Sequence, residues 1–193
     1  MKNHVVVVLL LLLNTLSIST QAQMNAYLDV GSFQLDDKTS YLEIYLSIVG
    51  KSVNYNRVTE GYEANINIVL QFLQNNEVKY YDKYTLHSPI VKDTSQVDFN
   101  FIDQQRITVE EGVYTMDFFI EDANNPNDNF HHTQSIKIDK KTGMSSIQFI
   151  QSYKKTKKQN QLSKSGYDLT PFVSNYYNND NHLLLFYTEF YQD

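Results

Sequence analysis

The stretch Tyr41-Leu-Glu-Ile-Tyr-Leu-Ser-Ile48 alternates strictly between two kinds of side chain. Its even positions are all Leu or Ile, whereas its odd positions carry aromatic, acidic or hydroxyl groups. Because successive side chains of a β-strand point to opposite faces, this pattern predicts a strand with one apolar face and one mixed face. The stretch therefore indicates a sheet that buries one of its sides.

The same alternation recurs along the chain. Ala64 to Phe72 and Glu77 to Leu86 alternate on either side of the polar pair Asn75-Asn76, which predicts a β-hairpin. Val113 to Ala123 and Thr133 to Asp139 predict two more strands, and no window of helical length shows a comparable 3.6-residue period. The chain is therefore expected to be all-β.

We expect residues 23–140 to form one antiparallel β-sandwich of the immunoglobulin or fibronectin type. Fifteen Tyr and eleven Phe supply strand-forming core residues, while Cys and Trp are absent. Turn residues from Asp122 to Asn129 predict a surface loop within this domain. The strand order is not determined by the sequence.

A weak internal repeat predicts a second unit after this sandwich. Met24 to Phe33 aligns without a gap with Met144 to Tyr153, and Leu42 to Ile48 is echoed by Leu184 to Phe190. Residues 144–193 are therefore expected to be an incomplete second β-sandwich-like repeat that offers only two strands, 147–153 and 183–191. Two strands cannot bury a core alone, so the chain is expected to be a fragment or to complete this module on something else.

The first 22 residues have the pattern of a secretory signal peptide. Lys2 precedes an uninterrupted apolar run from Val5 to Leu13, and small and polar residues lead to Ala22. The run is far shorter than the roughly 20 residues that cross a bilayer. We therefore expect cleavage between Ala22 and Gln23, export to the periplasm, cell surface or medium, and no transmembrane anchor.

Composition narrows the class of partner. The formal net charge of −6 becomes −7 without Lys2, so nucleic acid is not expected as a partner. The absence of Cys excludes disulfides, thiolate metal sites, a cysteine nucleophile and a lipid-bearing cysteine. Export without disulfides favours a bacterial envelope protein.

Two segments contain potential metal ligands. His131-His132 lies close to Asp128 and behind Glu121-Asp122, and imidazole with carboxylate suits a transition metal. If a strand runs through both histidines, their side chains point to opposite faces and only one can serve a given site. We therefore interpret the pair as an ordinary loop edge. Asp122 to Asn127 superficially resembles a calcium loop, although Asn127 stands where the sharp-turn Gly is required. No metal site and no cofactor are expected.

Catalytic motifs are also not apparent. Asp103-Gln-Gln-Arg106 places a carboxylate near a guanidinium, but a turn between strands with local pairing explains it as well. Lys154 to Lys158 could face an acidic glycan or lipid, although a short basic run is usually solvated surface. No nucleophile elbow, zinc-protease helix or phosphate-binding glycine loop occurs, so an enzyme is not expected.

Five segments resemble the N-terminal region of the GWxTD-domain proteins exported by Bacteroidetes. They are 41–48, 81–89, 101–106, 163–171 and 185–191, and the resemblance covers nearly the whole chain after residue 22. It implies β-sandwich modules ahead of a helical domain that holds the naming motif, which this chain lacks because it has no Trp.

These observations predict a non-enzymatic, exported module for adhesion, scaffolding or assembly, with other envelope proteins as partners. The alternative is a carbohydrate-binding module in polysaccharide capture, in which Tyr80, Tyr81 and Tyr84 stack on sugar rings. A third possibility is an accessory domain of a hydrolase. A row of exposed, coplanar tyrosines would favour sugar binding, and dispersed tyrosines would favour a scaffold.

Overall fold

The computed structural model describes residues 23–36, 39–139, 143–174, 176–177 and 183–191. The predicted signal peptide lies outside them. No helix among the described residues is long and apolar enough to span a membrane. The strands are β1 (Ala26–Asp36), β2 (Thr39–Val49), β3 (Asn56–Val58), β4 (Gly61–Glu63), β5 (Asn65–Gln74), β6 (Glu77–His87), β7 (Asn100–Ile107), β8 (Gly112–Asp122), β9 (Asn129–Ile138), β10 (Gln148–Lys155), β11 (Ser163–Lys164), β12 (Tyr167–Pro171) and β13 (Leu185–Tyr187).

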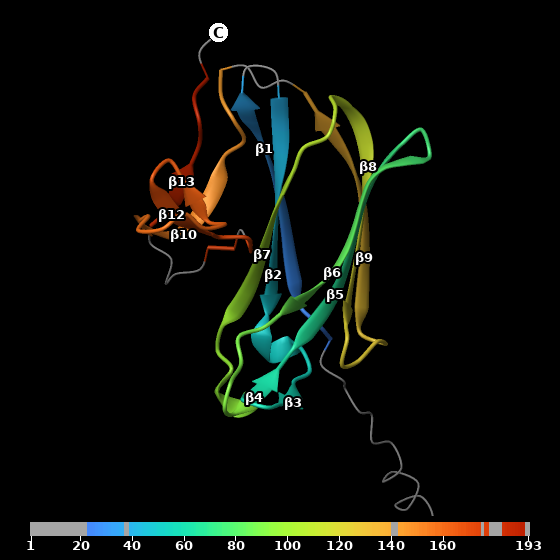
Figure 1. Ribbon diagram of the computed structural model, residues 1–193, viewed down its shortest axis with the longest axis vertical. Coiled ribbons are helices and arrows are strands. Elements are labelled where there is room, and N and C mark those ends of the chain that lie inside the picture. Colours follow the sequence, from blue (N-terminus) through green and yellow to red (C-terminus); the bar gives the residue numbers. More distant parts are fainter. Residues whose placement is uncertain (1–22, 37–38, 140–142, 175, 178–182, 192–193) are drawn as a thin grey trace, which may run out of the picture.

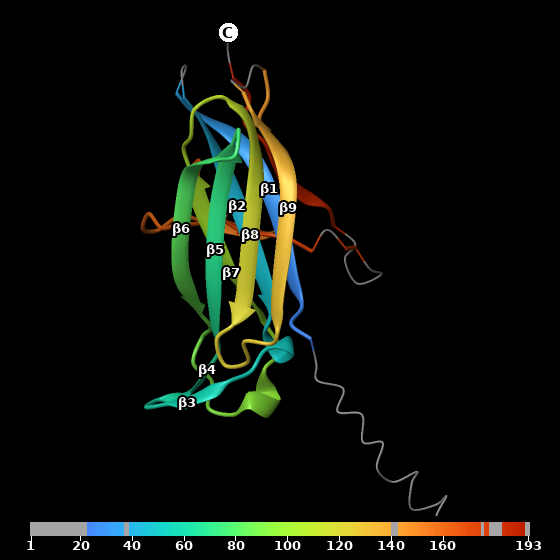
Figure 2. The same cartoon turned by 90° about the vertical axis from the view of Figure 1, so that its right-hand side faces the viewer.

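Two antiparallel sheets pack face to face along most of the length of the molecule (Figures 1 and 2). Sheet I has the order β1-β2-β7, and sheet II has the order β6-β5-β8-β9. The chain crosses between the sheets after β2, after β6 and again after β7. This confirms the antiparallel sandwich of the immunoglobulin or fibronectin type predicted from the alternation.

The predicted hairpin is present as β5 and β6, which pair in antiparallel register from Asn65↔His87 to Gln74↔Glu77. Asn75 and Asn76 form its turn with φ values of 52° and 63°. Two successive left-handed residues are typical of the tight turns that match the twist of a hairpin, and Asn tolerates this conformation.

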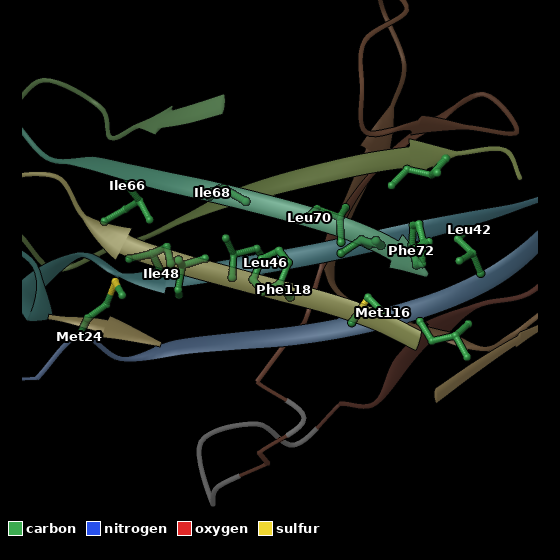
Figure 3. Close-up of a cluster of buried hydrophobic side chains, with 14 of the residues drawn as sticks. Met24, Leu42, Leu46, Ile48, Ile66, Ile68, Leu70, Phe72, Met116 and Phe118 are labelled. Atoms are coloured by element: carbon green, nitrogen blue, oxygen red, sulfur yellow. The ribbon is translucent and has the colours of Figure 1, made fainter. Parts of the chain in front are cut away.

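The apolar faces of the two sheets form a single core (Figure 3). Ile68 and Phe72 of β5 lie between the sheets with Leu46 of β2, and all three side chains are at most 2% exposed. Met116 and Phe118 of β8 complete this layer. The predicted inward register of β2 and β5 is therefore correct.

The segment from residue 143 onwards folds into a separate C-terminal sheet of order β11-β12-β10-β13. The two predicted strands are present as β10 and β13, which pair over three residues from Gln148↔Tyr187 to Ile150↔Leu185. The predicted number of strands in this segment was too small, because β12 pairs with the other edge of β10. A turn at Ser165-Gly166, both with positive φ, returns the chain from β11 to β12.

The C-terminal sheet lies against the outer face of sheet I, and its strands run across those of β1, β2 and β7 (Figures 1 and 2). Its β10–β13 pair is antiparallel, as is the β1–β2 pair that the internal repeat aligns with it. The assignment of residues 144–193 as an incomplete repeat stays a prediction.

One predicted turn is a strand. Asp103 to Arg106 lies inside β7, and each of its residues pairs with β2. The alternation is hidden here because Asp103 and Gln105 occupy the inward-facing positions, where they hydrogen-bond to each other at 3.1 Å. Local pairing was predicted for Arg106, but its side chain forms an ion pair with Glu43 of β2 instead.

Candidate functional site

Part of the outer face of sheet I is buried although it points away from the core. Glu43, Tyr45 and Ser47 are exposed by 0, 1 and 4%, respectively, because the C-terminal sheet covers them. The strict alternation of β2 thus serves two interfaces, one apolar and one polar. The polar interface is the candidate site.

A charged cluster lies at the centre of this interface, and we call Glu43, Tyr45, Arg106 and Lys164 the Glu43 cluster. The Lys164 ammonium donates to Glu43 Oε2 at 2.8 Å, and Arg106 Nε donates to Glu43 Oε1 at 2.7 Å. The Tyr45 hydroxyl also donates to Glu43 Oε2. All three donors therefore converge on one fully buried carboxylate.

Aromatic rings enclose the lysine of the cluster. Lys164 Nζ lies 3.1 Å from the ring centroid of Phe33 and 5.0 Å from that of Tyr187. The negative face of each ring attracts the ammonium in a site that excludes water. Phe33 belongs to β1 and Tyr187 to β13, so the lysine contacts both sheets at once.

Burial governs the protonation of the cluster. It lowers the pKa of Lys164 although the Glu43 carboxylate opposes this shift. Burial alone would also lower the pKa of Arg106, but its hydrogen bond to Glu43 and the Glu43 charge together outweigh burial and raise this pKa. Burial and the Glu43 charge together raise the pKa of Tyr45 far above its ordinary value, so the phenol keeps its proton and donates it.

Hydrogen bonds at the edge of β1 extend the attachment. Ser146 N donates to the Ser32 carbonyl, and Ser32 N donates to Ser146 Oγ, both at 2.9 Å. Farther along β1, the Tyr191 hydroxyl accepts a 2.9 Å bond from Gln34 N. These bonds cover part of an edge strand that would otherwise present unpaired backbone groups.

The three tyrosines singled out from the sequence do not form a row. Tyr80 and Tyr84 are half-buried on the inner face of β6, where Tyr80 packs on Phe72, and Tyr81 on the opposite face is 57% exposed. Tyr84 donates a 2.5 Å bond to Asp103, which joins the open edge of sheet II to that of sheet I. Tyr80 and Tyr84 therefore have structural roles.

The histidine pair lies inside β9, which begins four residues before the predicted strand, so it is not the loop edge that was predicted. The two side chains lie on opposite faces, as expected of neighbours within a strand. His131 pairs with Asp117 on the exposed face, whereas His132 stacks on Phe130 with ring centroids 6.2 Å apart. Among the described residues, no group of three His, Cys, Asp or Glu could hold a metal ion.

The carboxylates of the calcium-like loop are occupied by the chain itself. Asp122 accepts bonds from Asn54 N at 2.8 Å and from Asn124 N at 2.9 Å. Asp128 accepts two bonds from Met24 N, at 2.8 and 3.0 Å. These residues therefore fix the loop and the start of the described chain.

The basic run Lys154 to Lys158 lies at the end of β10 and in the exposed connection to β11. Lys154 is 4.0 Å from Asp168, and its side chain is largely exposed. The adjacent Tyr153 packs edge-to-face on Tyr167 at 5.9 Å. The run is thus a solvated surface with one distant ion pair.

Comparison of the chain with protein-family models, with curated proteins and with solved structures finds no match.

Proposed function

We propose that this chain is an exported, non-enzymatic β-sandwich module that serves in adhesion, scaffolding or assembly of a bacterial envelope. The C-terminal edge strand carries the proposal. Leu184 and Phe186 on or beside β13 are 54 and 55% exposed, and Phe190 is 79% exposed. Large apolar side chains beside a sheet edge are typical of surfaces that bind another protein.

The Glu43 cluster supports this function. Buried charges contribute little net stability compared with apolar groups, but they fix one arrangement because each must keep its partner. The cluster therefore holds the C-terminal sheet in a defined position on the sandwich. A rigid attachment suits a module that presents a binding edge to other envelope proteins.

The resemblance of residues 41–48 and 185–191 to GWxTD-domain proteins leads to the same proposal. On this proposal the chain is the N-terminal part of a longer protein in the envelope of a bacterium of the Bacteroidetes type. The predicted signal peptide and the absence of Cys accord with that location.

The test is the size of the complex that the chain forms in the envelope. The tagged chain would be cross-linked in cells and separated by native electrophoresis, for the original sequence and for Phe186→Ser/Phe190→Ser. The original chain should migrate in a complex larger than its own 22.5 kDa, and the double variant should be released from it. Val113→Ser is the matched control, because Val113 is 58% exposed on β8 of the sandwich.

Recovery of the original chain as a cytoplasmic monomer would contradict the proposal. Equal release by Val113→Ser and by the double variant would mean that the edge of β13 has no special role.

A further inference from the structure

A cleft of about 550 Å³ lies between sheet I and the C-terminal sheet. One wall is formed by the ends of β2 and β7, and the other by β10, by the end of β12 and by the residues that follow it. The volume is within the roughly 300–1,000 Å³ of small-molecule sites. The cleft exists only because the C-terminal sheet is held against the sandwich.

The polar side chains of this cleft have no hydrogen-bond partner within the described part of the chain. They are Ser47, Lys51, Asp98, Asn100, Gln151, Thr170 and Ser174. For exposed side chains, water is a sufficient partner. Ser47 is only 4% exposed, and the part of it that water reaches faces the cleft. Its hydroxyl can therefore exchange water for a polar group of a molecule that fills the cleft.

The charges of the cleft are balanced, since Lys51 and Asp98 carry one charge of each sign. Its remaining polar groups are amides and hydroxyls, which both donate and accept hydrogen bonds. Phe99 and Phe172 add aromatic surface to the lining. This combination suits a neutral molecule that carries many hydroxyl groups on an otherwise apolar frame.

We propose that the cleft between sheet I and the C-terminal sheet binds a neutral oligosaccharide. Ser47, Asn100 and Gln151 bond to its hydroxyl groups, and Phe99 and Phe172 contact the faces of its rings. This inference goes beyond the proposed assembly role and moves the sugar site away from the tyrosines of β6. A bound oligosaccharide would therefore contact sheet I and the C-terminal sheet at the same time.

The experiment is NMR titration of the full chain with cellohexaose, xylohexaose, mannohexaose and maltohexaose, each at millimolar concentration. At least one should shift the side-chain amide signals of Asn100 and Gln151. Asn100→Ala, Gln151→Ala and Ser47→Ala should each weaken that binding about tenfold, as expected when a hydrogen bond to a ligand is lost. Tyr81→Ala, at an exposed tyrosine of sheet II, is the matched control and should bind normally.

Three results would overturn the inference. The first is that none of the four oligosaccharides shifts a cleft signal. The second is that Tyr81→Ala abolishes binding while the cleft variants retain it. The third is that only polygalacturonate or a neutral hexapeptide of Ser and Asn binds in their place. Phe186→Ser/Phe190→Ser should leave sugar binding unchanged, so failure of the assembly proposal is distinguishable from failure of this one.

Discussion

The ammonium of Lys164 lies 2.8 Å from the carboxylate of Glu43, although the two residues are 121 positions apart in the chain. Lys164 has 6% of its side chain exposed, and Glu43 has none. The pair thus joins the two-residue strand β11 to the middle of β2. It therefore attaches the C-terminal sheet to the sandwich beneath it.

The first prediction concerns removal of the carboxylate. Glu43→Ala leaves a buried lysine without its partner, which should cost about 3–5 kcal/mol of unfolding free energy. The double variant Glu43→Leu/Lys164→Met should cost less, because an apolar pair leaves no buried charge from these two residues. Urea denaturation measures both values.

Glu121→Ala is the control for that experiment. Glu121 accepts one 3.1 Å bond from Asn67 on a half-exposed face, so its loss should cost about 1 kcal/mol or less. Equal losses for Glu43→Ala and Glu121→Ala would show that the cluster is not needed for stability.

The second prediction concerns the register of β5. Ile68 is fully buried, whereas its neighbour Asn67 is half-exposed on the opposite face. Ile68→Ala should cost roughly 2–5 kcal/mol, as large-to-small core changes do, and Asn67→Ala should cost about 1 kcal/mol. Thermal or urea unfolding of the two variants distinguishes them, and similar costs would contradict the register.

The sandwich was predictable because its signal is local. In β2 and β5 every second residue is apolar, and each period-2 run is long enough to define a face without knowledge of its partners. The turn at Asn75-Asn76 is equally local, since the conformational tolerance of Asn belongs to the residue itself.

The Glu43 cluster was not predictable, because its partners come from distant segments. The mixed face of β2 is visible in the sequence, but an acidic residue at an odd position is ordinary when that face meets water. Only the C-terminal sheet makes it buried. Arg106 was missed for a related reason: the polar Asp103 and Gln105 at inward positions obscure the alternation of β7.

The third prediction concerns the N-terminus. Met24 is 8% exposed and its backbone N–H donates to Asp128, so the described fold begins one residue after the predicted cleavage site. Protein recovered from the cell envelope should begin at Gln23, which is expected to cyclise. N-terminal sequencing after enzymatic removal of pyroglutamate measures this, and an intact Met1 would contradict it.

The fourth prediction concerns acid. Hydrogen bonds from the hydroxyls of Ser163 and Thr156 lower the pKa of Asp168 below its ordinary 3.8. A lowered folded-state pKa means that the carboxylate contributes stability above pH 3.8 and loses it as the pH falls through the folded value. NMR titration of the Asp168 carboxyl should show this low pKa, and Ser163→Ala should raise it towards 3.8.

An ordinary pKa for Asp168 in the original chain would contradict the hydrogen bonds that define the β11–β12 turn. No change on Ser163→Ala would assign the lowered pKa to the other neighbours of Asp168, foremost Thr156.

The last prediction concerns proteolysis of the connection between β10 and β11. Lys157 and Lys158 are exposed outside any strand, whereas Lys164 is buried in the Glu43 cluster. Trypsin should therefore cut first after Lys157 or Lys158 and spare Lys164, leaving a resistant fragment that contains the sandwich. The cut leaves β10 on the sandwich fragment, where β12 and β13 of the released piece pair with it, and Lys164 keeps its contacts with Glu43 and Phe33. The released piece should therefore stay bound to the sandwich in native buffer and separate only in denaturant. Mass spectrometry of the products under both conditions measures this. Glu43→Ala should weaken this attachment and should expose Lys164 to cleavage. Uniform resistance of residues 144–193 and 23–140 in the original chain would contradict the prediction that residues 144–193 are an incomplete repeat and would assign both sheets to one cooperative domain.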